Sequence, residues 1–152
     1  LKMGGPGFRD VSVIPNNGTT YYKPIYPKGS EYDRRTVYRF SPRGERSSIL
    51  DAFDCPDPST TAPRRAVTTT PLQALALLNN KFILDKAEDM ANRIKALSDG
   101  NRNKQIEQAF LFAFQRNPNS EEMLLAKRLI QDYGLTTLCR SLFNSNEFVI
   151  IN

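Results

Sequence analysis

Arginine and aromatic side chains alternate through the first half of the chain, and these are side chains that can bind anions. The arginines are Arg34, Arg35, Arg39, Arg43, Arg46, Arg64 and Arg65, with Tyr32, Tyr38 and Phe40 among them. A guanidinium group binds carboxylates and phosphates through a rigid fork of N–H donors, and it stacks on aromatic rings. The pattern has two interpretations, a surface for an acidic partner or single-stranded nucleic acid, and a set of internal ties.

In the second interpretation the arginines pair with Asp33, Asp51, Asp54 and Asp57 and hold irregular backbone in place, because buried polar groups need partners. We favour this interpretation on the sequence alone. The candidate residues of an interaction surface are Arg34, Arg35, Tyr38, Arg39, Arg64 and Arg65.

Asp51, Asp54 and Asp57 follow one another at intervals of three residues, so a calcium site is conceivable. The segment lacks the alternate ligand spacing and the distal glutamate of an EF-hand loop. Aspartate before proline is also ordinary turn chemistry. We therefore predict neither a metal nor another cofactor in this chain.

Catalytic chemistry has little support in the sequence. The chain has no histidine and no Gly-x-Ser-x-Gly motif, so neither a histidine base nor a nucleophile elbow is available. Glu88, Glu107 and Glu147 fall in helical segments, where glutamates are usually solvated. Three phenylalanines, at 110, 112 and 114, could line a pocket, but Phe110 and Phe114 share a helix face and are more simply core residues. We predict no catalytic residue and favour a non-catalytic role.

Composition describes an ordinary globular chain with a modest basic excess. The 152 residues carry a net charge of +5, and residues 1–70 hold 11 basic and 7 acidic residues, a net of +4. That excess favours acidic partners, but no lysine- and arginine-rich run points to nucleic acid. No apolar run approaches the roughly 20 residues that span a bilayer. The opening Leu1 to Pro6 reads like the interior of a longer protein, and we expect the chain to be a fragment.

The two cysteines, Cys55 and Cys139, lie in different halves of the chain. They could pair in an oxidising compartment or remain two separate thiols. Cys139 lies on an apolar helical stripe, which favours a small core residue.

The strongest local signal is a helix start at Thr70. Its hydroxyl can cap the helix, Pro71 suits the first helical position, and Gln73 can close a capping box with Thr70. A Leu-rich run ending at Asn79 follows. We interpret Thr70, Pro71, Gln73 and Asn79 as a structural motif that holds no ligand.

Composition changes near residue 70 and divides the chain into two parts. Residues 1–69 contain most of the prolines, glycines and tyrosines, which predicts an extended segment wrapped over a helical bundle. We expect one or two short strands there, one at residues 36–40, a helical turn at 47–53, and turns at 16–18, 27–29 and 42–44.

Residues 70–152 predict a small bundle of about five helices within one mainly α domain. The apolar stripes that should face its core are Leu72, Leu75, Ala76 and Leu78; Ile83, Ala87, Met90, Ala91, Ile94 and Leu97; Ile106, Ala109, Phe110, Ala113 and Phe114; Met123, Leu125, Ala126, Leu129, Ile130 and Tyr133; and Leu135, Leu138, Cys139, Leu142 and Phe143. Asn119 and Glu122 predict a second capping box.

Four sequence blocks resemble the C-terminal part of the PSD1 domain, also called DUF1553, found in large proteins of Planctomycetes and related bacteria. They are Tyr32 to Phe40, the run Leu50 to Asp57, Arg64 to Asn79, and Leu142 to Phe148. The third block is the most specific. Ser41 stands where family members often carry tryptophan.

The resemblance implies a context and supplies no catalytic residue. Such domains typically lie beside DUF1549-like and cytochrome-c-like segments in exported proteins. We therefore expect a periplasmic or extracellular module that docks against other domains of its parent protein. The alternative is an accessory part of a carbohydrate-processing enzyme, in which Tyr21, Tyr22 and Tyr26 would stack on sugars and catalytic residues would lie elsewhere.

Overall fold

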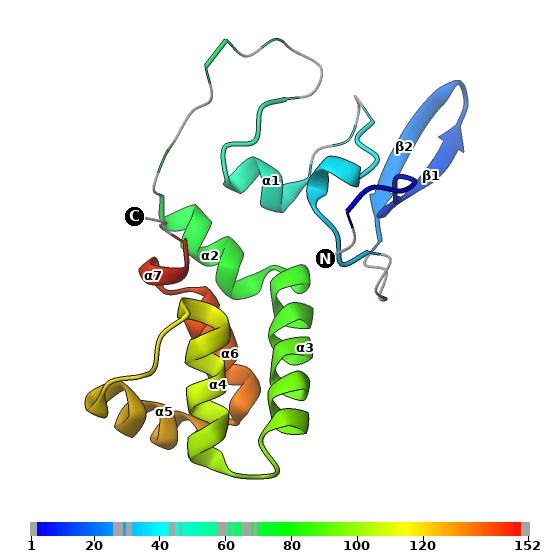
Figure 1. The fold of residues 1–152 in the computed structure, drawn as a ribbon. Helices are drawn as coiled ribbons and strands as arrows, with labels where there is room; N and C mark the ends of the chain where they lie inside the picture. The colour runs from blue at the N-terminus through cyan, green and yellow to red at the C-terminus, as the bar shows by residue number, and fades with distance from the viewer. Residues whose placement is uncertain are drawn as a thin grey trace. The chain divides into compact units, whose positions relative to one another are not determined.

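The computed structural model describes residues 3–25, 29, 32–42, 45, 47–57, 61, 63–64, 68 and 70–149. The chain forms two compact units, Leu1–Thr69 and Thr70–Asn152. The chain is mainly α, with one two-stranded antiparallel sheet in its described part (Figure 1). The predicted turns at 27–29 and 42–44 include residues outside those described.

A β-hairpin dominates the described part of the first unit. Strand β1 (Val11–Asn16) pairs antiparallel with β2 (Thr19–Pro24), and Asn16 lies opposite Thr19 (Figure 1). Asn17 and Gly18 form the two-residue turn between them with φ values of 40° and 82°. Positive φ at both positions is what a type I′ hairpin turn requires, which explains the Asn-Gly pair. The predicted turn at 16–18 is confirmed.

Both strands of the hairpin contain a proline at a position that leaves the ladder intact. The Ile25 amide donates to the Asp10 carbonyl over 2.7 Å, so this pair is hydrogen-bonded and Val11↔Pro24 next to it is not. Pro15↔Thr20 is also a non-hydrogen-bonded pair by the same alternation. The missing N–H groups of Pro15 and Pro24 therefore fall on the two outer edges, where they hinder pairing with another strand.

The strand predicted at residues 36–40 is wrong. Residues Thr36–Tyr38 form a 3₁₀ turn, closed by bonds from the Tyr38 and Arg39 amides to the Arg35 and Thr36 carbonyls. Arg39 alone forms a parallel bridge, with Phe8. The segment does not form a strand although its residues favour one. Its side chains contact other parts of the unit, and those contacts could not form if the side chains alternated along an extended strand.

The helical turn predicted at 47–53 is confirmed as α1 (Ser48–Ala52). After it, Asp54 adopts a left-handed conformation with φ of 56°. Its carboxylate accepts bonds from the Thr68 amide at 2.7 Å and from the Thr68 hydroxyl at 2.8 Å. This contact closes the loop that precedes the second unit.

The second unit is a helical bundle. Its helices are α2 (Pro71–Asn79), α3 (Lys81–Leu97), α4 (Arg102–Phe114), α5 (Ser120–Tyr133), α6 (Leu135–Phe143) and the short α7 (Asn146–Val149). The five predicted helices correspond to α2 through α6. Helix α6 packs against each of the other five, so it is the centre of the bundle (Figure 1).

Local signals set the helix boundaries. Thr70 and Gln73 form the predicted capping box, and so do Asn119 and Glu122. Asn80 caps α3 by accepting a bond from the Phe82 amide at 2.9 Å. Helix α4 ends earlier than Asn117, because Gln115 takes a left-handed conformation with φ of 58°.

The core of the bundle consists of side chains from α3, α4, α5 and α6. The buried members are Ala87, Ala91, Ile94, Ile106, Ala109, Phe110, Ala126, Leu135, Leu138, Cys139 and Leu142. Four of these are alanines, which let helix axes approach closely. Phe110 and Phe114 meet edge to face at 5.5 Å between ring centroids, so they are core residues as expected.

Five residues of the predicted stripes are exposed, and those predictions are wrong. They are Leu72, Leu75, Leu97, Leu125 and Tyr133. In α2 the buried side chains are Gln73 and Leu77 instead. Leu97 and Tyr133 are the last residues of their helices, and the residues buried just beyond them are Ser98 and Leu135.

Both cysteines are free thiols, and Cys139 is the small core residue that its stripe predicts. Burial raises the pKa of the Cys139 thiol to about 12. The thiolate, which is the reactive form, is therefore scarce at neutral pH.

We expect a thiol reagent at neutral pH to modify only Cys55 in the folded chain. Cys55 is half-buried, whereas Cys139 is fully enclosed. Mass spectrometry of the labelled protein measures this, and urea-unfolded protein is the control in which both thiols react. Fast labelling of Cys139 in the folded chain would contradict its place in the core.

Among the described helices, none combines the length and the apolar character needed to cross a bilayer.

Candidate interaction surface

Arg39, one of the candidate surface residues, is an internal tie. Its Nε donates to Asp10 at 2.7 Å, and its Nη2 donates to both oxygens of Glu45 at 3.0 and 2.9 Å. The side chains of Arg39 and Glu45 are only 7% and 5% exposed. Burial lowers the pKa of Arg39, but the bonds to Asp10 and Glu45 outweigh burial and leave the pKa raised. Arg39 thus joins three separate parts of the first unit.

Arg34 and Tyr38 are also occupied within the unit. Arg34 donates to the carbonyls of Pro6, at 2.6 Å, and Gly4. The Tyr38 hydroxyl accepts a bond from the Gly4 amide at 2.7 Å, and its ring lies 4.4 Å from the Arg34 guanidinium. The glycine-rich opening is therefore folded around these two side chains, which explains why Gly4, with φ of 76°, has no side chain.

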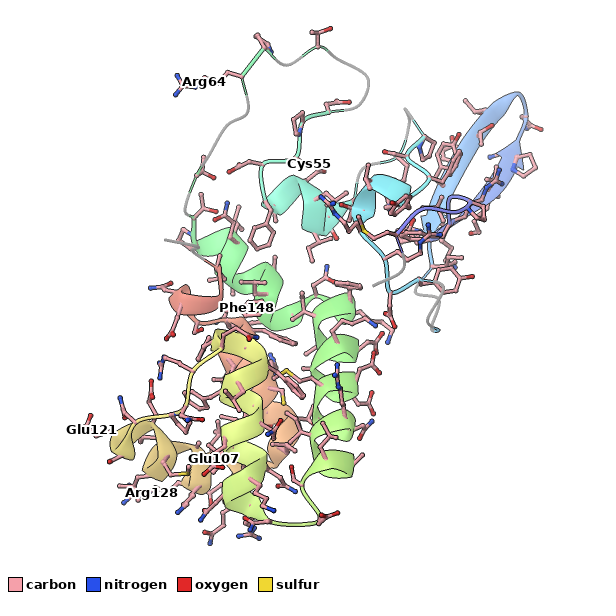
Figure 2. All side chains as sticks on the ribbon, in the orientation of Figure 1. Cys55, Arg64, Glu107, Glu121, Arg128 and Phe148 are labelled. Carbon is pink, nitrogen blue, oxygen red and sulfur yellow. The ribbon has the colours of Figure 1, made fainter. Side chains whose placement is uncertain are left out.

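The remaining candidates divide between exposed and undescribed residues. Arg35 and Arg64 are exposed, and Figure 2 shows the Arg64 side chain projecting from its loop. Arg65, like Arg43 and Arg46, lies outside the described residues. The structure therefore brings Arg34, Tyr38 and Arg39 together as a scaffold, whereas Arg35 and Arg64 are available to a partner.

Two further exposed cations were not among the candidates. Lys23 lies on strand β2, and Arg9 places its guanidinium 4.7 Å from the centroid of the Phe40 ring. Arg9 immediately precedes the Asp10 that holds Arg39, so the hairpin and the scaffold meet at this point. The sequence feature that could have indicated Arg9 is its position next to Phe8. This arginine-aromatic pair was missed because it lies far from the arginine-rich stretch.

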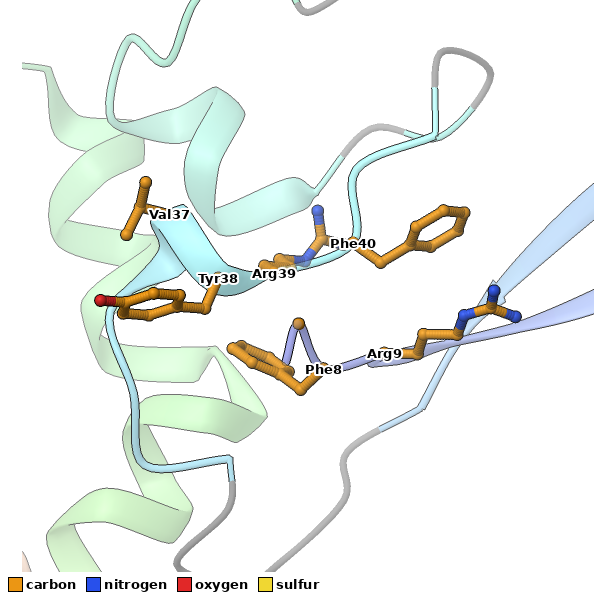
Figure 3. A pocket seen from close by; sticks show the side chains of 7 residues that line it. Phe8, Arg9, Val37, Tyr38, Arg39 and Phe40 are labelled. Atoms are coloured by element: carbon orange, nitrogen blue, oxygen red, sulfur yellow. The ribbon is translucent and has the colours of Figure 1, made fainter. Parts of the chain in front are cut away.

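A pocket of about 450 Å³ lies where the Phe8 segment crosses the Tyr38 segment. We call it the aromatic pocket, and its lining residues are Gly7, Phe8, Arg9, Val37, Tyr38, Arg39 and Phe40. Figure 3 shows Arg9 and Phe40 extending side by side from the two segments. Two hydrogen bonds hold the segments together, from the Phe8 amide to Tyr38 at 2.9 Å and from the Phe40 amide to Phe8 at 2.8 Å.

The tyrosines expected to stack on sugars do not form a described groove. Tyr21 is 57% exposed and Tyr22 is half-buried on the opposite face of the hairpin, since neighbouring strand residues alternate. Tyr26 lies outside the described residues. The aromatic pocket contains Tyr38 but neither Tyr21 nor Tyr22.

The aspartates considered for calcium serve other purposes in the described structure. Asp54 binds Thr68, and both Asp51 and Asp57 have partners. Among the described residues, no group of three or more acidic, cysteine or histidine side chains could hold a metal ion.

Glu147, which the sequence pattern placed among solvated glutamates, belongs to an ion-pair hub around Arg116. Arg116 donates to Glu147 at 2.7 and 2.8 Å and to Glu122 at 2.9 and 2.7 Å. Its guanidinium also lies 5.6 and 5.4 Å from the Phe110 and Phe114 rings. The hub ties the end of α4 to the starts of α5 and α7, so its role is structural.

Hydrogen bonds from Arg116 and from the Asn119 amide lower the pKa of Glu122 to about 2, and the bonds from Arg116 also lower the pKa of Glu147. A carboxylate with a lowered folded-state pKa adds stability above its unfolded pKa and loses it as the pH falls through the folded value. For Glu122 this window runs from about 4.5 down to about 2.

Glu147 is the residue that holds α7 to Arg116, and its pKa is also lowered, so we expect α7 to detach as acid protonates Glu147, before the bundle core unfolds. The ring centroids of Phe148 in α7 and Phe143 in α6 lie 5.0 Å apart. The NMR signals of the Phe148 ring therefore report whether α7 is attached. In Arg116→Met the detachment should already be present at neutral pH and should no longer depend on acid. If α7 stays attached both in acid and in Arg116→Met, the ion-pair hub does not hold α7 in place.

The structural motif at the start of the second unit keeps the role that the sequence predicts. The Thr70 amide donates to Gln73 Oε1 at 3.3 Å, and the Gln73 side chain is buried. Asn79 is exposed at the end of α2.

Comparison with known proteins gives one match. The family model described as PSD1, protein of unknown function (DUF1553), matches residues 1–130. No curated protein and no solved structure matches the chain.

Proposed function

The chain belongs to the PSD1 (DUF1553) family, and we propose that it is a non-catalytic docking module whose first unit binds a protein surface. In this proposal the partner is another domain of a larger exported protein, of the DUF1549-like or cytochrome-c-like kind. The second unit, which has its own core, is the support that carries the docking unit.

The exposed apolar side chains of the β1–β2 hairpin carry the proposal. Ile14 and Tyr21 lie directly opposite each other on one face, where they are 45% and 57% exposed. Ile25 continues that face beyond the strand and is 40% exposed. An isolated two-stranded hairpin is marginally stable in water unless one face packs against something. These three residues, which we call the hairpin face, therefore suit a protein partner.

The form of the hairpin favours side-chain contact over strand addition. Pro15 and Pro24 remove an N–H group from each outer edge, so a further strand would find an interrupted ladder. Ser12 and Lys23 lie on the same face between Tyr21 and Ile25, so the face combines an exposed tyrosine with polar neighbours. Tyrosine is among the residues that dominate binding energy at protein interfaces.

Calorimetric titration of the chain with the neighbouring domains of its parent protein tests the proposal. We expect Tyr21→Ser to weaken binding by about tenfold or more, because truncation of a central aromatic anchor typically costs about 2 kcal/mol. Leu125→Ser is the matched control, because Leu125 is 63% exposed but belongs to α5 of the second unit.

Equal affinities for Tyr21→Ser and the unchanged chain would remove the hairpin face from the interface. Absence of binding by a correctly folded chain would overturn the docking function itself. A glycan screen would then follow, because sugar stacking on Tyr21 is the alternative use of the same exposed ring.

A further inference from the structure

We propose that the aromatic pocket binds an acidic protein segment, with Arg9 holding a carboxylate and the pocket walls holding the apolar side chain beside it. This inference rests on the proposed docking function and names the chemistry of the partner.

In the described part of the first unit, the acidic side chains have partners, whereas several basic side chains make no ion pair. Each of its described acidic residues has a partner, namely Asp10, Asp33, Glu45, Asp51, Asp54 and Asp57. In contrast, Arg9, Lys23, Arg35 and Arg64 are exposed and make no ion pair with a described residue. The charge that this unit offers to a partner is therefore positive, which complements an acidic surface.

Arg9 is the exposed cation best prepared to bind a carboxylate. Stacking on Phe40 at 4.7 Å limits the orientations of its guanidinium, and no described acceptor uses its N–H donors. A guanidinium that is already oriented loses less entropy when it forms the paired N–H···O bonds with a carboxylate. Arg39 also lines the pocket, but its guanidinium donates to the Asp10 and Glu45 carboxylates.

The walls of the aromatic pocket define what should accompany the carboxylate. Phe8, Val37 and Phe40 are apolar, and Val37 is 74% exposed while Phe40 is 36% exposed (Figure 3). A volume of about 450 Å³ holds one large side chain with part of its backbone. An extended segment with an acidic residue next to an aromatic or aliphatic one fits both the positive charge of Arg9 and the apolar walls of the pocket.

Nucleic acid fits the pocket less well. Single-stranded nucleic acid is held by aromatic rings that stack on bases, together with a continuous basic groove. Here the rings of Phe40 and Tyr38 are already covered on one side by Arg9 and Arg34, at 4.7 and 4.4 Å.

Fluorescence anisotropy of labelled peptides with the full 152-residue chain tests the inference. The probe is a short peptide of alternating Glu and Phe, with both ends blocked so that only side-chain carboxylates are present. The comparison probes are the same peptide with Gln in place of Glu, and a short single-stranded DNA. Hairpin NMR signals verify that each variant remains folded.

We expect the Glu-Phe peptide to bind, the Gln-Phe peptide to bind about tenfold more weakly, and high salt to reduce the difference. Arg9→Gln should weaken binding of the Glu-Phe peptide by about tenfold, and Arg9→Lys should restore little, because lysine lacks the planar fork. Arg128→Gln, which changes an exposed arginine on α5 of the second unit, is the control and should change affinity by less than about twofold.

Three results would overturn the inference: equal binding of the Glu and Gln peptides, unchanged affinity of Arg9→Gln, or tighter binding of the DNA. The docking function has a separate readout in the hairpin face. If Tyr21→Ser weakens binding to the neighbouring domains while Arg9→Gln does not, docking stands and the acidic segment is rejected.

Discussion

Replacement of Arg39 by glutamine is expected to unfold the first unit while the helical unit remains intact. Arg39 and Glu45 are almost fully buried at 7% and 5% side-chain exposure, and Arg39 also binds Asp10. Removing one member of a buried ion pair typically costs about 3 kcal/mol or more, because the remaining charge is left without compensation.

That loss matters more in the first unit than it would elsewhere. Among its described residues, Val11 is the only buried hydrophobic side chain, so little apolar burial is available to replace the lost tie. The hairpin, the Phe8 segment and the 3₁₀ turn meet at Arg39, and they should lose their fixed arrangement together.

NMR amide signals measure this outcome: the hairpin signals should collapse in Arg39→Gln, whereas the helical circular dichroism should remain. Arg35→Gln, which changes the exposed neighbour, should leave the hairpin signals in place. Joint replacement by Arg39→Met and Glu45→Leu should recover part of the structure that Arg39→Gln loses, because an apolar pair can take the place of a buried ion pair. Hairpin signals as strong in Arg39→Gln as in Arg35→Gln would refute the role of this tie.

Replacement of Ile106 by alanine is expected to reduce the stability of the helical unit by about 3 kcal/mol, through lost apolar burial and the cavity left behind. Ile106 is fully enclosed, on the face of α4 that packs in the bundle core. The alanines at 87, 91, 109 and 126 allow close helix packing, so the surrounding helices have little room to close the cavity.

Urea denaturation followed by circular dichroism measures the free energy of unfolding. Leu125→Ala is the control, because this exposed leucine should contribute less than about 0.5 kcal/mol. The hairpin signals should persist in Ile106→Ala under conditions where the helices remain folded. Similar losses for the two variants would mean that the core is not where the structure places it.

The helical unit could be predicted from sequence because its signals are local. The capping boxes join residues three positions apart, as in the bond from the Glu122 amide to Asn119 at 2.8 Å. The central members of the apolar stripes in α3, α4 and α6 are also correct, since helical periodicity places them on one face. The predictions for Leu97 and Tyr133 at the stripe ends are wrong, because periodicity alone does not decide which residue at a helix end faces the core; next to Leu97 it is Ser98 that is buried.

The interaction surface could not be predicted in the same way, because its contacts join distant residues. Arg39 and Asp10 are 29 positions apart, and Arg116 and Glu147 are 31 apart. No local pattern identifies such partners, so Arg39 was a surface candidate and Glu147 a solvated glutamate. The hairpin was missed although its Asn17-Gly18 turn was predicted, because Pro15 and Pro24 interrupt the strand pattern at positions that prove to be edges.

Hydrogen–deuterium exchange of the chain, alone and with the neighbouring domains of its parent protein, tests the docking function most directly. Docking through the first unit should slow exchange on binding at residues 11–25 and 35–40, which contain the hairpin and part of the aromatic pocket, and should leave exchange in α3, α4 and α5 unchanged. Protection confined to the helical unit, with the hairpin unchanged, would contradict the proposal that the first unit is the docking surface.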